Sequence, residues 1–198
     1  MMKIKIQTAL FLFGILLFNG CGFKQTALDV NHYSISYSST KQPYINSTKS
    51  IYIETPSVNK SFNTNAILYT QKPYLFEQYA KNRWVDLPSN MIHNYLVQGI
   101  EDSNVFKSVL QKRVDIAFDY TLKSNIINLY NSFEEGKSYA ILKIKFDLVS
   151  KEKLLKTYSY DKKVLCQTNR PYGFIVAINK AFDEVMDELT LKLSKEVK

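Results

Sequence analysis

The chain has 198 residues, of which 45% are hydrophobic and 22% charged, and it carries a formal net charge of +8. This balance is ordinary for a globular protein and argues against a disordered chain. The lysines are spread over the whole sequence, so we do not expect nucleic acid as a partner. Fourteen tyrosines and twelve phenylalanines against six glycines favour a strand-rich fold, because aromatic side chains suit half-buried pleated surfaces.

The first 20 residues have the features of a secretory signal peptide that ends at a lipidation site. Lys3 and Lys5 precede an uncharged apolar run over residues 8–18, and a glycine stands directly before Cys21. A positive segment, a short apolar stretch and a small residue at the cut are the marks of a removable signal. We predict a bacterial lipoprotein in which Cys21 carries covalent lipid, such as palmitate, and no other cofactor is needed. An uncleaved membrane anchor is the alternative.

The mature chain is predicted to contain a flexible tether and one domain. Residues 21–31 show no sustained apolar period and form the tether, and residues 32–198 have the length of a single domain. The leader takes two lysines and no acid with it, so the net charge falls from +8 to +6. This excess suits anionic lipid head groups, and a solvated surface rich in lysine explains it equally well.

Alternation of apolar residues predicts strands before a first helix. Patterns with a period of two begin at Tyr33 and at Ile51, and the second run ends before Pro56. A hairpin is predicted from the runs at 66–69 and 74–84, which are rich in aromatic residues.

Two helices and further strands follow along the chain. Pro88 opens the first predicted helix, which runs to about Asp102 with Ile92, Leu96 and Ile100 on one apolar face. The run at 105–110 fits either a strand or a helical turn. Strands are predicted at 116–123, 140–148 and 155–166, with a polar turn at 134–137 and a long helix from about residue 172 to the C-terminus.

This order of elements predicts an α+β fold in which an antiparallel sheet has two helices packed on one face. The order also suggests two similar strand-helix-strand halves, although no repeat of fixed period is visible. The outer face of the sheet, rich in Lys and Tyr, is a candidate contact surface, and a solvated face is the plainer interpretation.

We find no pattern typical of a catalytic or metal site, and we predict that the protein is not an enzyme. His32 and His93 have no Cys, His or carboxylate at ligand spacing. Cys166 is expected to be a buried apolar filler, with a disulfide between chains as the alternative. The carboxylates of the last helix flank its apolar stripe and are interpreted as a solvated face: Asp183, Glu184, Asp187 and Glu188.

One short motif lies between the predicted hairpin and the first helix. Arg83 and Trp84 are followed by Asp86, Leu87 and Pro88. Together with the lipoprotein cysteine, the alternating strands and the long last helix, this motif resembles the ABC-type transport auxiliary lipoproteins, which accompany MCE-type lipid transport systems. A tryptophan at a strand-helix corner usually belongs to the core, and Trp and Arg are also favoured at interfaces, so either role fits these five residues.

The resemblance implies an accessory lipoprotein without catalytic residues that supports movement of phospholipids between the two membranes. Its implied partners are an MCE-domain protein, the ABC permease and ATPase, and membrane lipids through the acyl anchor. Gly22 stands where many inner-membrane lipoproteins have Asp, which favours the periplasmic face of the outer membrane. The alternatives are a lipoprotein of lipopolysaccharide export or outer-membrane protein assembly, and a carrier that holds lipid between sheet and helices.

Overall fold

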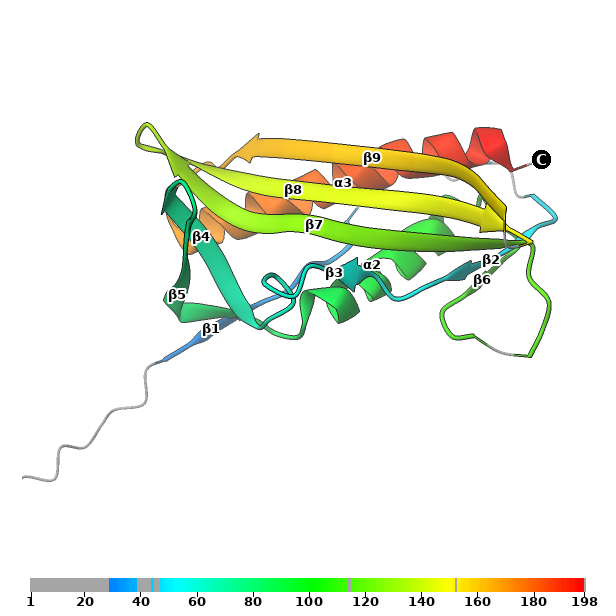
Figure 1. The fold of residues 1–198 in the computed structure, drawn as a ribbon, viewed down its shortest axis with the longest axis horizontal. Coiled ribbons are helices and arrows are strands. Elements are labelled where there is room, and N and C mark those ends of the chain that lie inside the picture. Colours follow the sequence, from blue (N-terminus) through cyan, green and yellow to red (C-terminus); the bar gives the residue numbers. More distant parts are fainter. Residues whose placement is uncertain (1–28, 39–43, 45–46, 114, 152, 198) are drawn as a thin grey trace, which may run out of the picture.

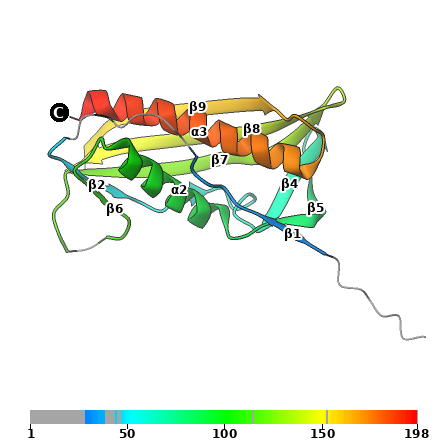
Figure 2. The same cartoon turned by 180° about the vertical axis from the view of Figure 1, so that it is seen from behind.

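The computed structural model describes residues 29–38, 44, 47–113, 115–151 and 153–197. Within them, nine strands form one sheet, and two helices lie on the same face of it (Figure 1, Figure 2). The order along the chain is five strands, a helix, four strands and a helix. The predicted α+β class and the placement of both helices are confirmed, and the similarity of two halves stays a prediction.

Three long antiparallel strands form one side of the sheet, with β9 at its edge: β7 (Tyr120–Glu134), β8 (Lys137–Ser150) and β9 (Lys153–Leu165). Buried and more exposed residues alternate along β8, as expected for a sheet with one covered face. The turn between β7 and β8 contains Glu135 and Gly136, both with positive φ, which is the geometry that tight hairpins require. The polar turn predicted at 134–137 is therefore confirmed.

The other edge of β7 holds three short strands one after another. They pair parallel to β7, so the sheet is mixed where the short strands join it. Parallel neighbours need long crossover connections, and α2 lies in the connection that returns the chain to β7. The strands that pair with β7 are β2 (Ser50–Ile53), β3 (Ser57–Val58) and β4 (Ala66–Lys72). The strand β6 (Ser108–Leu110) pairs with the far side of β2. The strand β5 (Leu75–Trp84) pairs with the far side of β4 and is followed by β1 (Asn31–Tyr33).

The helices α2 (Pro88–Ser103) and α3 (Pro171–Glu196) each begin with proline in the first turn, where its missing N–H is not needed. All the residues of their predicted apolar stripes are buried. The helix α3 packs on β8 and β9, and α2 touches α3 at Gly99, where an added Cβ would lie 2.7 Å from Met186 Cε. The largest fully buried side chains include Phe146, Phe174 and Phe182.

The strand predicted at 116–123 differs most from the structure. The strand β7 starts at Tyr120 and continues to Glu134, while Ile116 lies outside it and is exposed. Three buried positions of β7 carry polar side chains, Ser124, Asn131 and Ser132, and a bulge after Ile126 shifts the alternation. These features hide the second half of the strand from an apolar pattern.

Two further differences between the predicted and the observed strands concern short segments. The strand β1 ends at Tyr33, yet Ile35 remains buried, because the following segment lies along α3 with Ser36 N–H donating to Asn179 Oδ1 at 2.9 Å. The ambiguous run at 105–110 contains a strand from Ser108 that pairs with β2. In both places a tertiary contact decides the local conformation.

Candidate functional site

The predicted lipidation site, Cys21, lies outside the described residues, as do the signal sequence and most of the tether. Its modification therefore stays a prediction. The structure fixes where the chain enters the domain, because Asn31 opens β1 and pairs with Asn82 of β5. No helix among the described residues is both long and apolar enough to cross a membrane.

The motif residues Arg83 and Trp84 form the end of β5. Trp84 is only 2% exposed, and its ring centre lies 6.1 Å from that of Phe174 on α3. Its backbone N–H donates to Asn65 O at 2.8 Å. The Trp84 side chain thus joins the hairpin strand to the helix layer and offers almost no surface to a partner.

The Arg83 guanidinium is half-buried and turns back along its own strand. Its Nη1 donates to the carbonyl oxygens of Tyr79 and Asn82, the second at 2.9 Å. These bonds satisfy backbone acceptors of β5.

The remaining motif residues, Asp86, Leu87 and Pro88, turn the chain from β5 into α2. Asp86 Oδ1 accepts from the Leu87 N–H at 2.6 Å and from Asn90 Nδ2 at 3.1 Å. Pro88 is buried at the first position of the helix. The five motif residues thus build one strand-helix corner, and their contacts are those of a structural element.

An aromatic cluster holds the β4–β5 hairpin against β7. Phe62, Phe76 and Tyr130 have ring centres 5.0 to 5.9 Å apart. Tyr79 Oη donates to Asn131 Oδ1 at 2.6 Å, and burial raises the pKa of Tyr79 well above its ordinary value. The hairpin is therefore fixed to the sheet by an edge-to-face contact between Phe76 and Tyr130 and by a hydrogen bond that needs the neutral phenol.

The tip of this hairpin is uncovered. Tyr74 is fully exposed with a φ of 69°, and Leu75 and Phe76 are 48% and 47% exposed. A groove of about 280 Å³ separates the tip from the end of β7. In the sequence, alternation indicated the hairpin but gave no sign that its apolar tip would remain in solvent.

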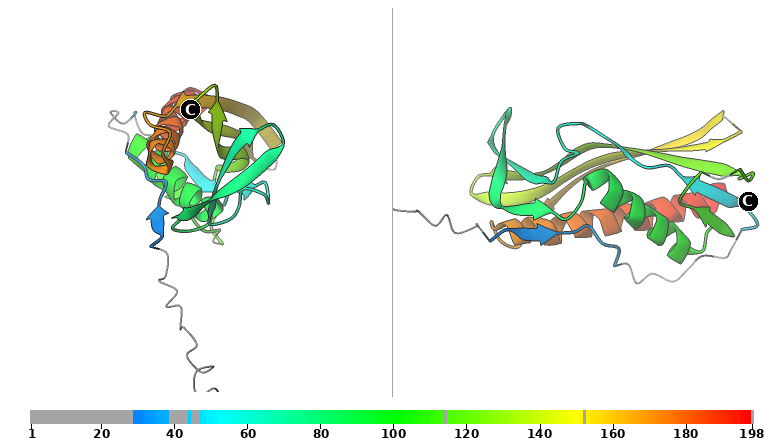
Figure 3. Two further views of the ribbon diagram at one scale, coloured as in Figure 1. Left: turned by 90° about the vertical axis from the view of Figure 1, so that its left-hand side faces the viewer. Right: turned by 90° about the horizontal axis from the view of Figure 1, so that it is seen from below.

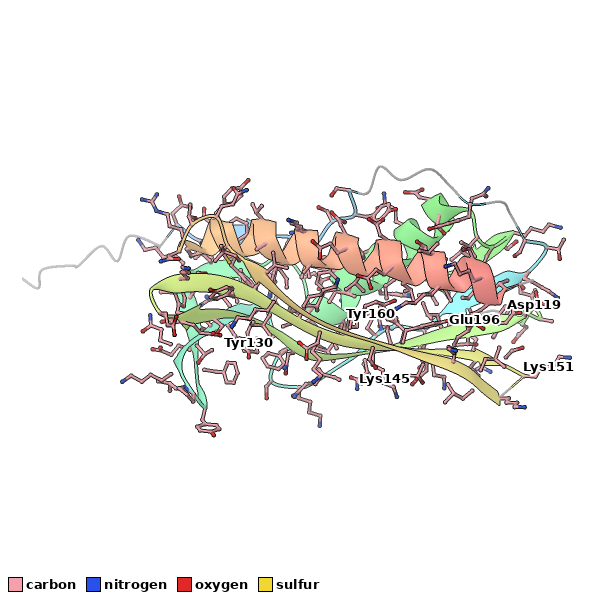
Figure 4. All side chains as sticks on the ribbon, turned by 90° about the horizontal axis from the view of Figure 1, so that it is seen from above. Asp119, Tyr130, Lys145, Lys151, Tyr160 and Glu196 are labelled. Atoms are coloured by element: carbon pink, nitrogen blue, oxygen red, sulfur yellow. The ribbon has the colours of Figure 1, made fainter. Side chains whose placement is uncertain are left out.

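The outer face of the sheet carries charged pairs, one between β8 and β9 and one within β8. Lys143 Nζ lies 3.3 Å from Asp161 Oδ2, and Lys145 Nζ lies 3.3 Å from Asp147 Oδ2. Lys145 lies on the side away from the helices, whereas Tyr160 lies on the helix side (Figure 4). Exposed pairs of this kind contribute little to stability, so this face has the character of a solvated surface.

The carboxylates of α3 form more hydrogen bonds and ion pairs than their spacing in the sequence indicated. Asp183 accepts from Tyr95 Oη at 2.8 Å and from Ser38 Oγ at 2.6 Å, and Glu188 pairs with Lys162 at 2.7 Å. Burial, then the nearby Asp183 charge, raises the pKa of Tyr95 far above its ordinary value. The interpretation of these carboxylates as merely solvated is therefore wrong for Asp183.

The other residues considered for catalysis or metal binding are the two histidines and Cys166. His93 is half-buried with Nε2 3.0 Å from Ile53 O, and His32 is exposed on β1. Cys166 is a buried free cysteine, and burial raises the pKa of its thiol, which disfavours the reactive thiolate. The described residues contain no group of three His, Cys, Asp or Glu side chains arranged to hold a metal ion.

Comparison with known proteins adds a family and two similar structures. The model of the ABC-type transport auxiliary lipoprotein component family matches residues 33–190. The crystal structure of protein XCC0632 from Xanthomonas campestris is 16% identical with a TM-score of 0.73, and the match covers 81% of this chain and 93% of that one. A crystal structure of an uncharacterized protein is 11% identical with a TM-score of 0.68, over 83% and 98% of the two chains. No curated protein matches the chain.

Proposed function

Because this chain belongs to the ABC-type transport auxiliary lipoprotein family, we propose that it is the lipid-anchored, non-catalytic accessory component of an MCE-type phospholipid transport system. The observation that carries the proposal is the family match over residues 33–190, which spans the domain from β1 into α3. The predicted signal sequence over residues 1–20 supports a lipid anchor on Cys21, and Gly22 after it favours the periplasmic face of the outer membrane.

The arrangement of side chains supports an accessory role. The buried polar groups near the motif and the hairpin, such as Asn131, form hydrogen bonds within the fold. A general acid or base needs a titratable group in a cleft with a pKa near the working pH, whereas burial raises the pKa of Tyr79 and Tyr95 well above their ordinary values. The domain thus offers surfaces for binding, and we assign it partners: an MCE-domain protein, the permease and the ATPase.

A crosslinked pull-down from detergent-solubilised membranes tests the proposal. The full-length lipidated chain is the bait, Cys21→Ala is the matched control without the anchor, and mass spectrometry identifies the recovered proteins. Recovery of an MCE subunit or an ABC permease with the native chain supports the proposal. Recovery of an outer-membrane barrel without these subunits contradicts it and favours a factor of lipopolysaccharide export or barrel assembly.

A further inference from the structure

Exposed apolar side chains gather at the end of the molecule that carries the β4–β5 hairpin. Tyr74, Leu75 and Phe76 lie at the hairpin tip. Leu165 (56% exposed) ends β9, and Tyr172 (64% exposed) lies in the first turn of α3. The hairpin, the end of β9 and the start of α3 share one end of the long axis (Figure 1). Exposed apolar side chains that gather at one end of a domain are candidates for contact with a protein or a membrane.

The N-terminal strand reaches the domain at the same end. The strand β1 runs parallel to the last residues of β5, with Asn31 opposite Asn82 and Tyr33 opposite Trp84. The ring of Tyr33 also lies 6.4 Å from that of Tyr172. The strand β1 therefore begins at the hairpin end of the domain (Figure 3).

Chain lengths allow the acylated cysteine and the hairpin tip to reach one surface. Ten residue steps separate Cys21 from Asn31 and span up to about 33 to 36 Å. Along β5, seven steps separate Asn82, the partner of Asn31, from Leu75, which is about 23 Å. The tether is thus longer than the distance from the base of the hairpin to its tip.

We propose that the hairpin tip is a second membrane attachment, in which Tyr74 and Leu75 enter the interfacial layer of the bilayer that holds the Cys21 lipid. This inference rests on the lipid anchor of the proposed function. Tyrosine suits the interface because it has an apolar ring and a polar hydroxyl, and the exposed Lys72, two residues before Tyr74, can meet lipid phosphates.

The attachment gives the domain a fixed orientation. A lipid at the end of a tether limits the distance of the domain from the membrane and leaves its rotation free. A second contact removes that freedom, because the hairpin is held to β7 by Phe62, Phe76 and Tyr130 and moves with the sheet. The opposite end, with the start of β7 and the end of α3, then points into the periplasm.

Quenching of tryptophan by brominated lipid tests the proposal. The full-length lipidated chain with Tyr74→Trp is placed in phosphatidylethanolamine and phosphatidylglycerol vesicles whose acyl chains carry bromine. Ile116→Trp is the matched control, since Ile116 is an exposed apolar residue of the loop before β7, at the opposite end. The buried Trp84 is a constant background in both. We expect quenching at position 74 to exceed that at position 116 by about twofold or more.

Equal quenching at positions 74 and 116, or none at 74, overturns the proposal. If Tyr74→Trp does not fold, Leu75→Trp replaces it with the same two outcomes. One further outcome overturns it in favour of a protein contact. In that outcome position 74 shows no quenching, and the pull-down loses the transport subunits when Tyr74 and Leu75 are changed to serine.

Failure of the proposed function gives a different result. In that case the mass of the purified chain shows no acyl group on Cys21, or the pull-down recovers no transport subunit, while the bromine measurement still reports the depth of the hairpin.

Discussion

The β4–β5 hairpin and the meander core, which we define as β7, β8, β9 and α3, differ in how their apolar side chains are covered. In the meander core the strands and α3 bury Phe146, Phe174 and Phe182 almost completely. In the hairpin, β5 begins with exposed residues and ends with the buried Trp84. Both regions are rich in aromatic residues, so composition does not explain the difference.

The contrast indicates a division of roles between stability and contact. Burial of large apolar side chains supplies most of the free energy of folding, and the meander core holds most of it. The hairpin keeps Tyr74 in a left-handed conformation that costs a residue other than glycine of the order of 1 kcal/mol. An exposed tyrosine in such a turn adds little to stability, which supports a role in contact.

The largest expected effect compares the two ends of β5. We expect Trp84→Ala to lower the free energy of unfolding by about 3 to 5 kcal/mol, because it removes a fully buried indole and leaves a cavity. Phe76→Ala, at 47% exposure, should cost about 1 to 1.5 kcal/mol. Urea unfolding followed by far-UV circular dichroism measures both values, and equal losses would remove the distinction between the two regions.

A smaller effect tests how tightly the meander core is packed. An added Cβ at Gly173 would lie 2.2 Å from the backbone oxygen of Thr168, so we expect Gly173→Ala to cost about 1 to 3 kcal/mol. Ala80→Val on the exposed part of β5 is the control and should stay within about 0.5 kcal/mol of the native chain. Thermal unfolding of both variants checks this, and a Gly173→Ala chain of native stability contradicts it.

Two tyrosines that face α3 should respond in opposite directions. Tyr95 Oη donates to Asp183, so we expect Tyr95→Phe to cost about 1.5 kcal/mol. Tyr160 Oη is buried and has no hydrogen-bond partner among the described residues, so Tyr160→Phe should leave stability unchanged or raise it by about 1 kcal/mol. Chemical denaturation distinguishes the two, and a loss at Tyr160 as large as that at Tyr95 would reveal a partner for its hydroxyl.

The smallest expected effect is a loss of stability at low pH that depends on Asp119, the residue just before β7. Hydrogen bonds from Ser50, followed by the Lys49 charge, hold the pKa of Asp119 below its ordinary value. A depressed carboxyl pKa contributes stability above the unfolded pKa, and the contribution disappears as the pH falls through the folded pKa. We expect the native chain to lose stability below about pH 4 more steeply than Asp119→Asn. Identical pH profiles of unfolding would assign no role to this carboxylate.

The sequence predicted the helices better than the sheet. The apolar stripe of α3 repeats over about five turns, and proline marks the start of both helices, so local signals agree. The second half of β7 was missed because two polar residues, Asn131 and Ser132, are buried there, and a polar side chain is buried only where distant segments supply hydrogen-bond partners. Asn131, for example, is satisfied by Tyr79 and Ser138.

The candidate site was only partly predictable for the same reason. The residues from Arg83 to Pro88 were identified from their order, yet their structural role depends on Phe174, Asn65 and Asn90. The exposed hairpin tip had no sequence signal, since Tyr74, Leu75 and Phe76 have the composition of a buried strand.

The sequence by itself determined the α+β class, the two helices and the antiparallel hairpins, because these depend on the spacing of residues near one another in the chain. Only the tertiary structure decided that short strands join β7 in parallel, that Trp84 is covered and that Tyr74 is not. Burial depends on which distant segment packs on a side chain, and no local pattern contains that information.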